Sequence, residues 1–178
     1  MLALSVSDLA KSFGARTLFR SVSFEVRAGE KVALFGPNGC GKSTLLNIIS
    51  GLTEPDSGTV WTRPGVILGY LPQALQFQGD LTPSDLCGDP AVLGRFGIEP
   101  ATASMPMSNL SAGQHRRVGL AQVWAAQPDL IMLDEPTNHL DAPAMDLLAR
   151  LIRSSRAAVL LVSHDRYFLD HTARRILE

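Results

Sequence analysis

The sequence has little net charge, few cysteines and no long apolar run, and each of these absences narrows the range of functions. Its 16 lysines and arginines stand against 17 aspartates and glutamates, which gives a formal net charge of −1. Such a balance exerts no general attraction on nucleic acid, although it leaves room for a local basic patch. The two cysteines, Cys40 and Cys87, form no CxxC or zinc pattern, which is typical of a protein from a reduced, cytoplasmic setting.

No apolar stretch approaches the roughly 18 residues that a membrane-spanning helix needs, and the N-terminus lacks a signal-peptide pattern. A role at a membrane would therefore need a separate partner. The 178 residues, 46% of them apolar, are enough for about one domain with a substantial core. We expect a soluble, single-domain protein.

Three short apolar runs at 32–35, 130–133 and 157–162 lack polar alternation, which predicts parallel strands covered by helices on both faces. A helical pattern follows each run. The fold class is therefore α/β, with ligands expected at the carboxyl ends of the strands. The segments 2–6 and 18–26 instead favour an N-terminal pair of antiparallel strands.

The segment 79–106 is rich in glycine and proline and carries only short apolar patches, which favours a small inserted helical subdomain. We predict one domain over 1–178. Its core comprises 1–72 and 128–178, and a reduced helical subdomain comprises 73–127.

The stretch GPNGCGKST at 36–44 lies between a predicted strand and a helix-like segment, as a phosphate-binding loop does. Its glycines allow the backbone N–H groups to turn toward a phosphate. Lys42 would reach the β- and γ-phosphates, Ser43 would bind Mg²⁺ and Thr44 would contact the α-phosphate. A glycine-rich turn that merely ends a strand is the alternative. The predicted nucleotide contacts in the loop are Gly36, Pro37, Asn38, Gly39, Cys40, Gly41, Lys42, Ser43 and Thr44.

A second motif, LIMLDEPTNHLD at 130–141, ends a buried strand in two carboxylates. Asp134 would hold Mg²⁺ through its water shell, and Glu135 would polarise the attacking water. The alternative is that the two carboxylates only cap the following segment.

A third motif, LSAGQ at 110–114, precedes a helical run. Ser111 and Gln114 fit a helix capping box, which is a complete structural explanation. The same helix N-terminus could also bind a phosphate, and it would then face the nucleotide of another such domain. We interpret Arg116 and Arg117 as solvated residues on one helix face, with a contact to RNA as the alternative.

Together these motifs resemble the nucleotide-binding domain of an ATP-binding-cassette (ABC) ATPase, and the resemblance runs nearly end to end. It implies a P-loop NTPase fold with ATP and Mg²⁺ as cofactors. Phe13 matches the residue that stacks on adenine, and Gln73 matches the glutamine that senses Mg²⁺ and the γ-phosphate. Asp141 matches a carboxylate that communicates across a dimer, and His164 matches the switch histidine at the γ-phosphate.

The resemblance also implies how these residues divide by role. The expected catalytic residues are Lys42, Glu135 and His164. The expected metal site comprises Ser43, Gln73 and Asp134. The signature residues Ser111, Gly113 and Gln114 would bind nucleotide across a dimer, with Ala112 where the commonest form of the motif has glycine.

Within the family, DEPTNHLD and SHDRYFLD are most similar to the ABC-F branch. These are soluble ATPases, usually with two cassettes in one chain, and many act on the ribosome in translation or antibiotic resistance. Transporter cassettes more often read S-x-L-D after DEPT, so Asn138–His139 is the discriminating pair. The sequence lacks a second cassette and its linker, and 73–110 is short for a cassette. We expect a fragment, a degenerate half or a compact stand-alone cassette.

The sequence thus favours an ATP hydrolase whose site is completed by a second cassette, with the ribosome as a further partner. One alternative is the ATP-binding subunit of a membrane transporter. Phe77, Leu81, Leu86 and Leu93 would then form a groove for the membrane subunit, unless they are the subdomain's own core. The other alternative is a nucleotide-dependent assembly module with low turnover.

Overall fold

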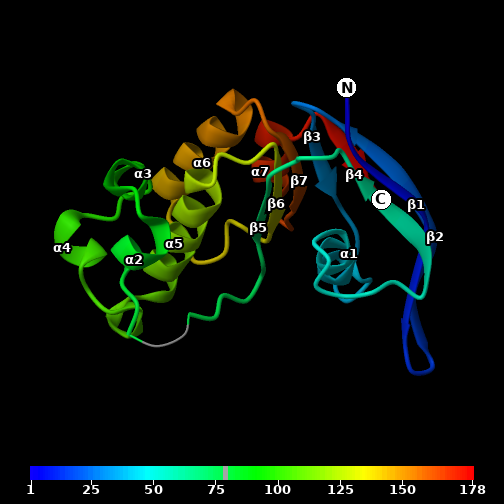
Figure 1. Cartoon of the computed structure of the whole chain (residues 1–178), viewed down its shortest axis with the longest axis horizontal. Coiled ribbons are helices and arrows are strands. Elements are labelled where there is room, and N and C mark those ends of the chain that lie inside the picture. Colours follow the sequence, from blue (N-terminus) through cyan, green and yellow to red (C-terminus); the bar gives the residue numbers. More distant parts are fainter. Residues whose placement is uncertain (78–79) are drawn as a thin grey trace.

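The computed structural model describes residues 1–77 and 80–178, and it contains two sheets with a helix between them (Figure 1). The first sheet is antiparallel, in the order β2-β1-β4, from β1 (Leu2–Phe13), β2 (Arg16–Arg27) and β4 (Ser57–Thr62). β1 and β2 form a hairpin whose pairing runs from Leu2 with Arg27 to Phe13 with Arg16. The two predicted antiparallel strands are therefore confirmed, and both extend beyond the apolar segments that predicted them.

The second sheet is parallel, in the order β5-β6-β7-β3-β8. Its central strands are β3 (Lys31–Leu34), β6 (Leu130–Asp134) and β7 (Ala158–Val162), and every residue in them is buried. These are the three strands that the apolar runs predicted. The edge strands β5 (Leu68–Leu71) and β8 (Arg175–Leu177) were not predicted, because these short strands are only partly buried and do not form the continuous apolar runs of the central strands.

Each face of the parallel sheet packs against its own core, which explains the continuous apolar runs. In β6, Leu130 and Met132 face the cluster that contains α1 (Lys42–Ile49) and the antiparallel sheet. Ile131 and Leu133 face the opposite cluster, which contains α6 (Ala142–Ser154) and α7 (Arg166–Thr172). The helix α1 is thus enclosed between the two sheets, and its first turn lies at the carboxyl edge of β3 (Figure 1).

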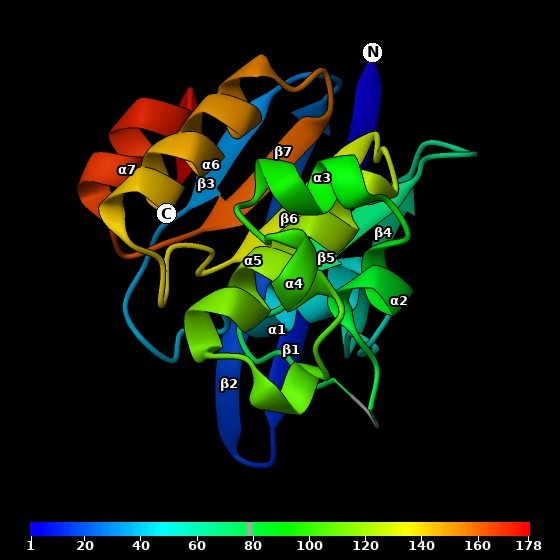
Figure 2. The same ribbon diagram turned by 90° about the vertical axis from the view of Figure 1, so that its left-hand side faces the viewer.

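The helical region comprises α2 (Pro83–Cys87), α3 (Pro90–Arg95), α4 (Pro100–Ala103), η1 (Met107–Asn109) and α5 (Ala112–Ala125). Figure 2 shows the short helices gathered in front of α5 and the parallel sheet. α2, α3 and α4 each begin with proline, which suits a first turn because its missing N–H has no helical partner there.

This region confirms that 79–106 is helical, with Gly79 outside the described residues. The division at 73 and 127 stays a prediction, because α5 contacts both β5 and the short helices. Among the described residues, no helix has the length and apolar character that crossing a bilayer requires.

Candidate functional site

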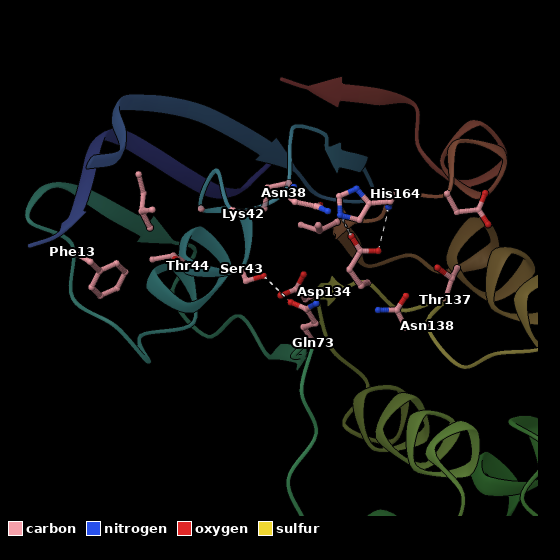
Figure 3. A pocket seen from close by; sticks show the side chains of 16 residues that line it. Phe13, Asn38, Lys42, Ser43, Thr44, Gln73, Asp134, Thr137, Asn138 and His164 are labelled. Carbon is pink, nitrogen blue, oxygen red and sulfur yellow. Dashed lines mark hydrogen bonds and ion pairs between the residues drawn. The ribbon is translucent and has the colours of Figure 1, made fainter. Parts of the chain in front are cut away.

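A cavity of about 740 Å³ opens where β3, β6 and β7 end, at the carboxyl edge of the parallel sheet (Figure 3). Most of the residues predicted from sequence line it. They are Phe13, Asn38, Gly39, Gly41, Lys42, Ser43, Thr44, Gln73, Asp134, Glu135 and His164. The predicted residues that do not line it are Gly36, Pro37, Cys40, Ser111, Gly113, Gln114 and Asp141.

The loop between β3 and α1 places a helix N-terminus in this cavity. Gly41 is the N-cap of α1, with φ of 105°, and it provides no side-chain cap for the first N–H groups. A Cβ at this position would lie 2.9 Å from the ring of Phe19, so the position requires glycine for space as well as for conformation. The free N–H groups and the positive end of the helix favour an anion at this point.

Lys42 supplies a cation at the same point. Its Nζ donates hydrogen bonds to the carbonyl oxygens of Gly36 at 2.8 Å and Pro37 at 2.9 Å. The ammonium group therefore lies within the curve of the loop, beside the uncapped N-terminus of α1. A phosphate in the loop would meet both positive groups.

Ser43, Gln73 and Asp134 converge although they come from three separate segments (Figure 3). The Ser43 hydroxyl lies 3.5 Å from Oε1 of Gln73. Asp134 is 1% exposed, and neither of its carboxylate oxygens has a hydrogen-bond partner in the described part of the chain. Buried carboxylate oxygens without donors suit a hard cation such as Mg²⁺, and the hydroxyl and amide oxygens beside them complete an oxygen donor set.

Burial raises the pKa of Asp134, because the charged form loses its hydration. Four neighbouring side chains favour the charged form and so lower this pKa: Ser43, Arg116, Lys42 and His164. The Ser43 hydroxyl lies near the carboxylate but does not meet full hydrogen-bond geometry. The described residues contain no group of three or more His, Cys, Asp or Glu side chains arranged as metal ligands. A cation here would therefore depend on the three oxygen donors and on the nucleotide.

Glu135 follows directly and adopts a left-handed backbone, with φ of 48°. This conformation is costly for a residue other than glycine, and such strain gathers at functional sites. Oε2 of Glu135 accepts a hydrogen bond from the His164 backbone N–H at 3.2 Å. The His164 ring Nε2 lies 3.0 Å from Oε1, at ion-pairing distance but without hydrogen-bond alignment. Burial raises the pKa of Glu135, and the contacts to His164 partly offset this.

Phe13 forms the outer rim of the cavity and is 58% exposed, although it is a large apolar side chain. The Lys11 Nζ lies 5.6 Å from the ring centroid, within cation–π range. Lys11 is itself held by Asp56 at 2.9 Å and by the carbonyl of Glu54 at 2.8 Å. The ring is thus supported from its own strand and offers an exposed aromatic surface to a flat ligand.

Comparison with known proteins identifies this arrangement. The family model described as ABC transporter matches residues 19–138. The chain belongs to the ABC transporter family. The cassette is therefore an ATPase domain of the ABC type, and domains of this family bind ATP and work as dimers.

The relatives include proteins of more than one kind. The cassette is 38% identical to the ribosome protection protein VmlR of Bacillus subtilis over 95% of the cassette and 32% of that protein. It is 36% identical to the zinc import ATP-binding protein ZnuC of Cereibacter sphaeroides over 99% of the cassette and 79% of that protein. The cassette spans between 28% and 36% of the length of its first three curated relatives.

Among solved structures, the cassette resembles the dimeric post-hydrolysis state of an ATP-binding cassette bound to ADP and Pi. The TM-score is 0.85 at 25% identity, over 98% of the cassette and 94% of that chain. The predicted α/β fold with a P-loop core is confirmed by this likeness.

The start of α5 lies apart from the cassette's own cavity. Ser111 and Gln114 form the capping box that the sequence predicted: Ser111 Oγ accepts from the Gln114 N–H at 3.3 Å, and Gln114 Oε1 accepts from the Ser111 N–H at 2.9 Å. Gly113 packs so tightly that a Cβ would lie 2.7 Å from the carbonyl oxygen of His139. The predicted capping box is thus present, whereas a role of these residues in binding a nucleotide stays a prediction.

Asp141 is also engaged away from the cavity. It is the N-cap of α6 and accepts a hydrogen bond from the Ala144 N–H at 3.1 Å. Its carboxylate accepts two further hydrogen bonds from Arg117, at 2.9 and 3.0 Å. These contacts join the start of α6 to α5.

The sequence-based interpretation of Arg116 is wrong. Arg116 is only 2% exposed, and its guanidinium binds backbone carbonyls beneath the cavity. The spacing of the residues could have predicted this burial, because Arg116, Leu120 and Val123 follow the i, i+4, i+7 pattern of a buried helix face. All three residues are buried. Arg117, the next residue, keeps partial exposure in its ion pair with Asp141.

Five residues that line the cavity were not predicted as site residues from the sequence: Leu18, Thr137, Asn138, Val162 and Asp165. Asn138 had been noted only for its value in separating branches of the family. Thr137 and Asn138 could have been predicted as lining residues, because they follow the two carboxylates closely in the sequence.

Proposed function

We propose that the cassette binds ATP with Mg²⁺ in the cavity and hydrolyses it once a second cassette closes over the γ-phosphate. One observation carries the proposal: Asp134 and the adjacent Glu135 face the phosphate loop across one cavity, and the buried Asp134 carboxylate has no hydrogen-bond partner among residues 1–77 and 80–178. Phosphoryl transfer depends mainly on positioning and charge stabilisation, and this cavity offers both.

The roles follow from position and charge. Lys42 and the N-terminus of α1 hold the phosphates, while Phe13 stacks on the adenine. Ser43, Gln73 and Asp134 would hold Mg²⁺, which would neutralise charge on the β- and γ-phosphates.

Glu135 orients and polarises the attacking water. Burial raises the pKa of this carboxyl toward neutrality, and a base whose pKa approaches the working pH is better matched to its task. His164, which contacts Glu135, fixes the carboxylate and reaches the γ-phosphate.

The second cassette would supply Ser111, Gly113 and Gln114. The proposal is supported by their position at the N-terminus of the 14-residue helix α5, outside their own cavity, because the positive end of a helix favours an anion. Asp141 would relay closure between the two cassettes. An open monomer would be a poor ATPase, and ATP binding would drive closure while hydrolysis reopens the pair.

As to its biological setting, we propose an ABC-F-type ATPase of translation or antibiotic resistance, or one half of such a protein. Asn138–His139 and the HDRYFLD segment support this proposal, as does the likeness to a ribosome protection protein. Co-sedimentation with ribosomes in the presence of ATP would test it.

The ATP-binding subunit of a transporter is the second candidate. A further cavity of about 520 Å³ supports it, because Phe77, Leu81 and Leu86 line an apolar opening beside α5. Leu93, by contrast, is 1% exposed and belongs to the core. The likeness to a zinc import ATP-binding protein also favours this candidate.

The mass of the Glu135→Gln protein in solution tests the shared part of both proposals. By sedimentation, we expect a dimer with ATP and Mg²⁺ and a monomer with ADP. The reason is that the variant should bind ATP but not hydrolyse it. A monomer that binds ATP would mean that the second cassette comes from elsewhere, either from a further part of a longer protein or from a different protein. A chain that binds no ATP would overturn the proposal.

A further inference from the structure

Arg116 joins three segments that are far apart in the sequence. Its Nη1 donates hydrogen bonds to the carbonyl oxygens of Pro72 at 2.8 Å and Gln73 at 3.3 Å, in the loop after β5. Its Nη2 donates to the carbonyl oxygen of Asp134 at 2.6 Å and to that of Glu135, at the end of β6. One guanidinium on α5 therefore binds the backbone of two segments, 72–73 and 134–135, that carry cavity residues.

Packing alone does not require a charge at this point. The same face of α5 continues with Leu120 and Val123, and an apolar residue at 116 would fit the pattern. Burying a guanidinium costs hydration free energy, and burial accordingly lowers the pKa of Arg116. The carbonyl contacts offset this cost, and the planar fork of an arginine can reach several acceptors at once.

The backbone groups that Arg116 holds carry the side chains of the predicted chemistry. Gln73 extends from its loop to Ser43, and Glu135 extends into the cavity from a strained, left-handed backbone. A strained backbone of this kind persists only where contacts with the surrounding structure hold it in place. Arg116 does not line the cavity, so it would act on the nucleotide only through these two loops.

The third segment is α5 itself. Arg116 lies in the second turn of the helix that begins at the Ser111 cap, where the proposed second cassette would dock. A shift of this helix on closure would move the guanidinium and the four carbonyls together.

We propose that Arg116 is a positioning residue that couples the signature end of α5 to Gln73 and Glu135 within one cassette. This inference rests on the proposed function, because it assigns a task to Arg116 in ATP turnover. Nucleotide affinity comes mainly from the phosphate loop and Phe13, which Arg116 does not touch. The residue therefore affects turnover far more than binding.

The test compares Arg116→Met with Arg116→Lys, using the full chain. Arg95→Gln is the matched control, since Arg95 is an exposed arginine of the same helical region. The measurements are the Kd for ATP, kcat at saturating ATP–Mg²⁺ and thermal unfolding. We expect Arg116→Met to lower kcat by about 10- to 100-fold, because a misplacement of about 1 Å has such an effect, with Kd changed by less than about threefold. Arg116→Lys recovers part of kcat, and Arg95→Gln resembles the wild type.

The outcomes separate a positioning role from a structural one. A kcat of Arg116→Met within about twofold of the wild type would overturn the inference, as would a parallel loss of binding and turnover. If Arg116→Met does not fold, Arg116→Lys decides: a lower kcat at unchanged Kd supports the inference, and an unchanged kcat overturns it. A wild-type chain that neither binds nor hydrolyses ATP would instead overturn the proposed function, and this inference with it.

Discussion

The cavity around Asp134 and the start of α5 are two polar regions with opposite internal bonding. In the cavity, buried oxygens of Asp134 have no partner among the described residues, and Glu135 adopts a strained backbone. At the start of α5, Ser111 and Gln114 satisfy each other, and Asp141 is paired with Arg117. The first region has polar groups that only a ligand can complete, whereas the second is complete as folded.

This difference indicates a division of labour within the proposed composite site. The cavity gives up stability in order to present charge to a nucleotide, as active sites commonly do. The start of α5 keeps its stability and acts as a rigid surface. Substitutions should therefore impair catalysis but spare stability in the first region, and lower stability in the second.

The largest expected effect comes from Glu135→Gln. Removing the base while keeping the shape should lower ATP turnover by about 10²- to 10⁴-fold, because general-base catalysis contributes about that much. ATP binding should persist, since the phosphate loop is unchanged. Steady-state phosphate release and the Kd for ATP measure the two effects.

Asp165→Asn is a suitable control for that experiment, because Asp165 also lines the cavity but caps α7 through the Phe168 N–H. Because the asparagine oxygen can accept the same hydrogen bond, stability should be nearly unchanged and the loss of turnover should be much smaller than in Glu135→Gln. Wild-type hydrolysis by Glu135→Gln would remove Glu135 from the role of base.

Asp134→Asn gives the second-largest effect and sharpens the comparison directly. In EDTA, this change should stabilise the fold by about 1–3 kcal/mol near pH 8, because it removes an unpaired buried charge. The folded pKa of Asp134 is raised, so the folded state loses stability as the pH rises through that pKa. The gain should therefore shrink as the pH falls and vanish below about pH 3, where the carboxyl is protonated in both the folded and the unfolded state.

Urea unfolding of the wild type and Asp134→Asn at several pH values measures this gain. The same variant should lose its Mg²⁺-dependent turnover. A destabilised Asp134→Asn protein would show that the carboxylate already has a partner in the folded chain, and the contrast between the two regions would fail.

Ser111→Ala should have the smallest effect and the opposite sign. Loss of the capping oxygen should destabilise the fold by about 1 kcal/mol, as at other helix N-caps. Monomeric ATP binding should be unchanged, because Ser111 lies outside its own cavity. Ser108→Ala is the matched control, since Ser108 is exposed just before the cap. A Ser111→Ala protein as stable as that control would show that the cap contributes little.

The sequence predicted most of the cavity because its residues lie in contiguous motifs. The residue types and their spacing fixed Lys42, Ser43, Asp134 and Glu135 next to strand ends, and the carboxyl ends of parallel strands meet at one edge. Local motifs could not show what each polar side chain contacts across the fold. That is why Arg116 was misassigned: its four acceptors come from loops more than 15 residues away in either direction along the chain.

Short edge elements were also beyond the sequence patterns. β5 brings Gln73 to the cavity, yet it has only four residues, two of them partly exposed. Its place in the sheet is set by pairing with β6, from Leu68 with Leu130 to Leu71 with Leu133, and such distant pairing leaves no local signal. Gln73 was therefore assigned through family resemblance rather than through its own surroundings.

The order of the parallel sheet has a consequence for how the chain folds during synthesis. β3, which carries the phosphate loop, pairs with β7 and β8, the last two strands of the described chain. The β1–β2 hairpin can form from the first 27 residues, but β3 must wait for partners more than 120 residues later. Such long-range parallel pairing is slow and leaves apolar edges exposed until it is complete. The nucleotide site thus cannot be completed until β7 has been synthesised, and a nascent chain shorter than about residue 162 would leave β3 without this partner.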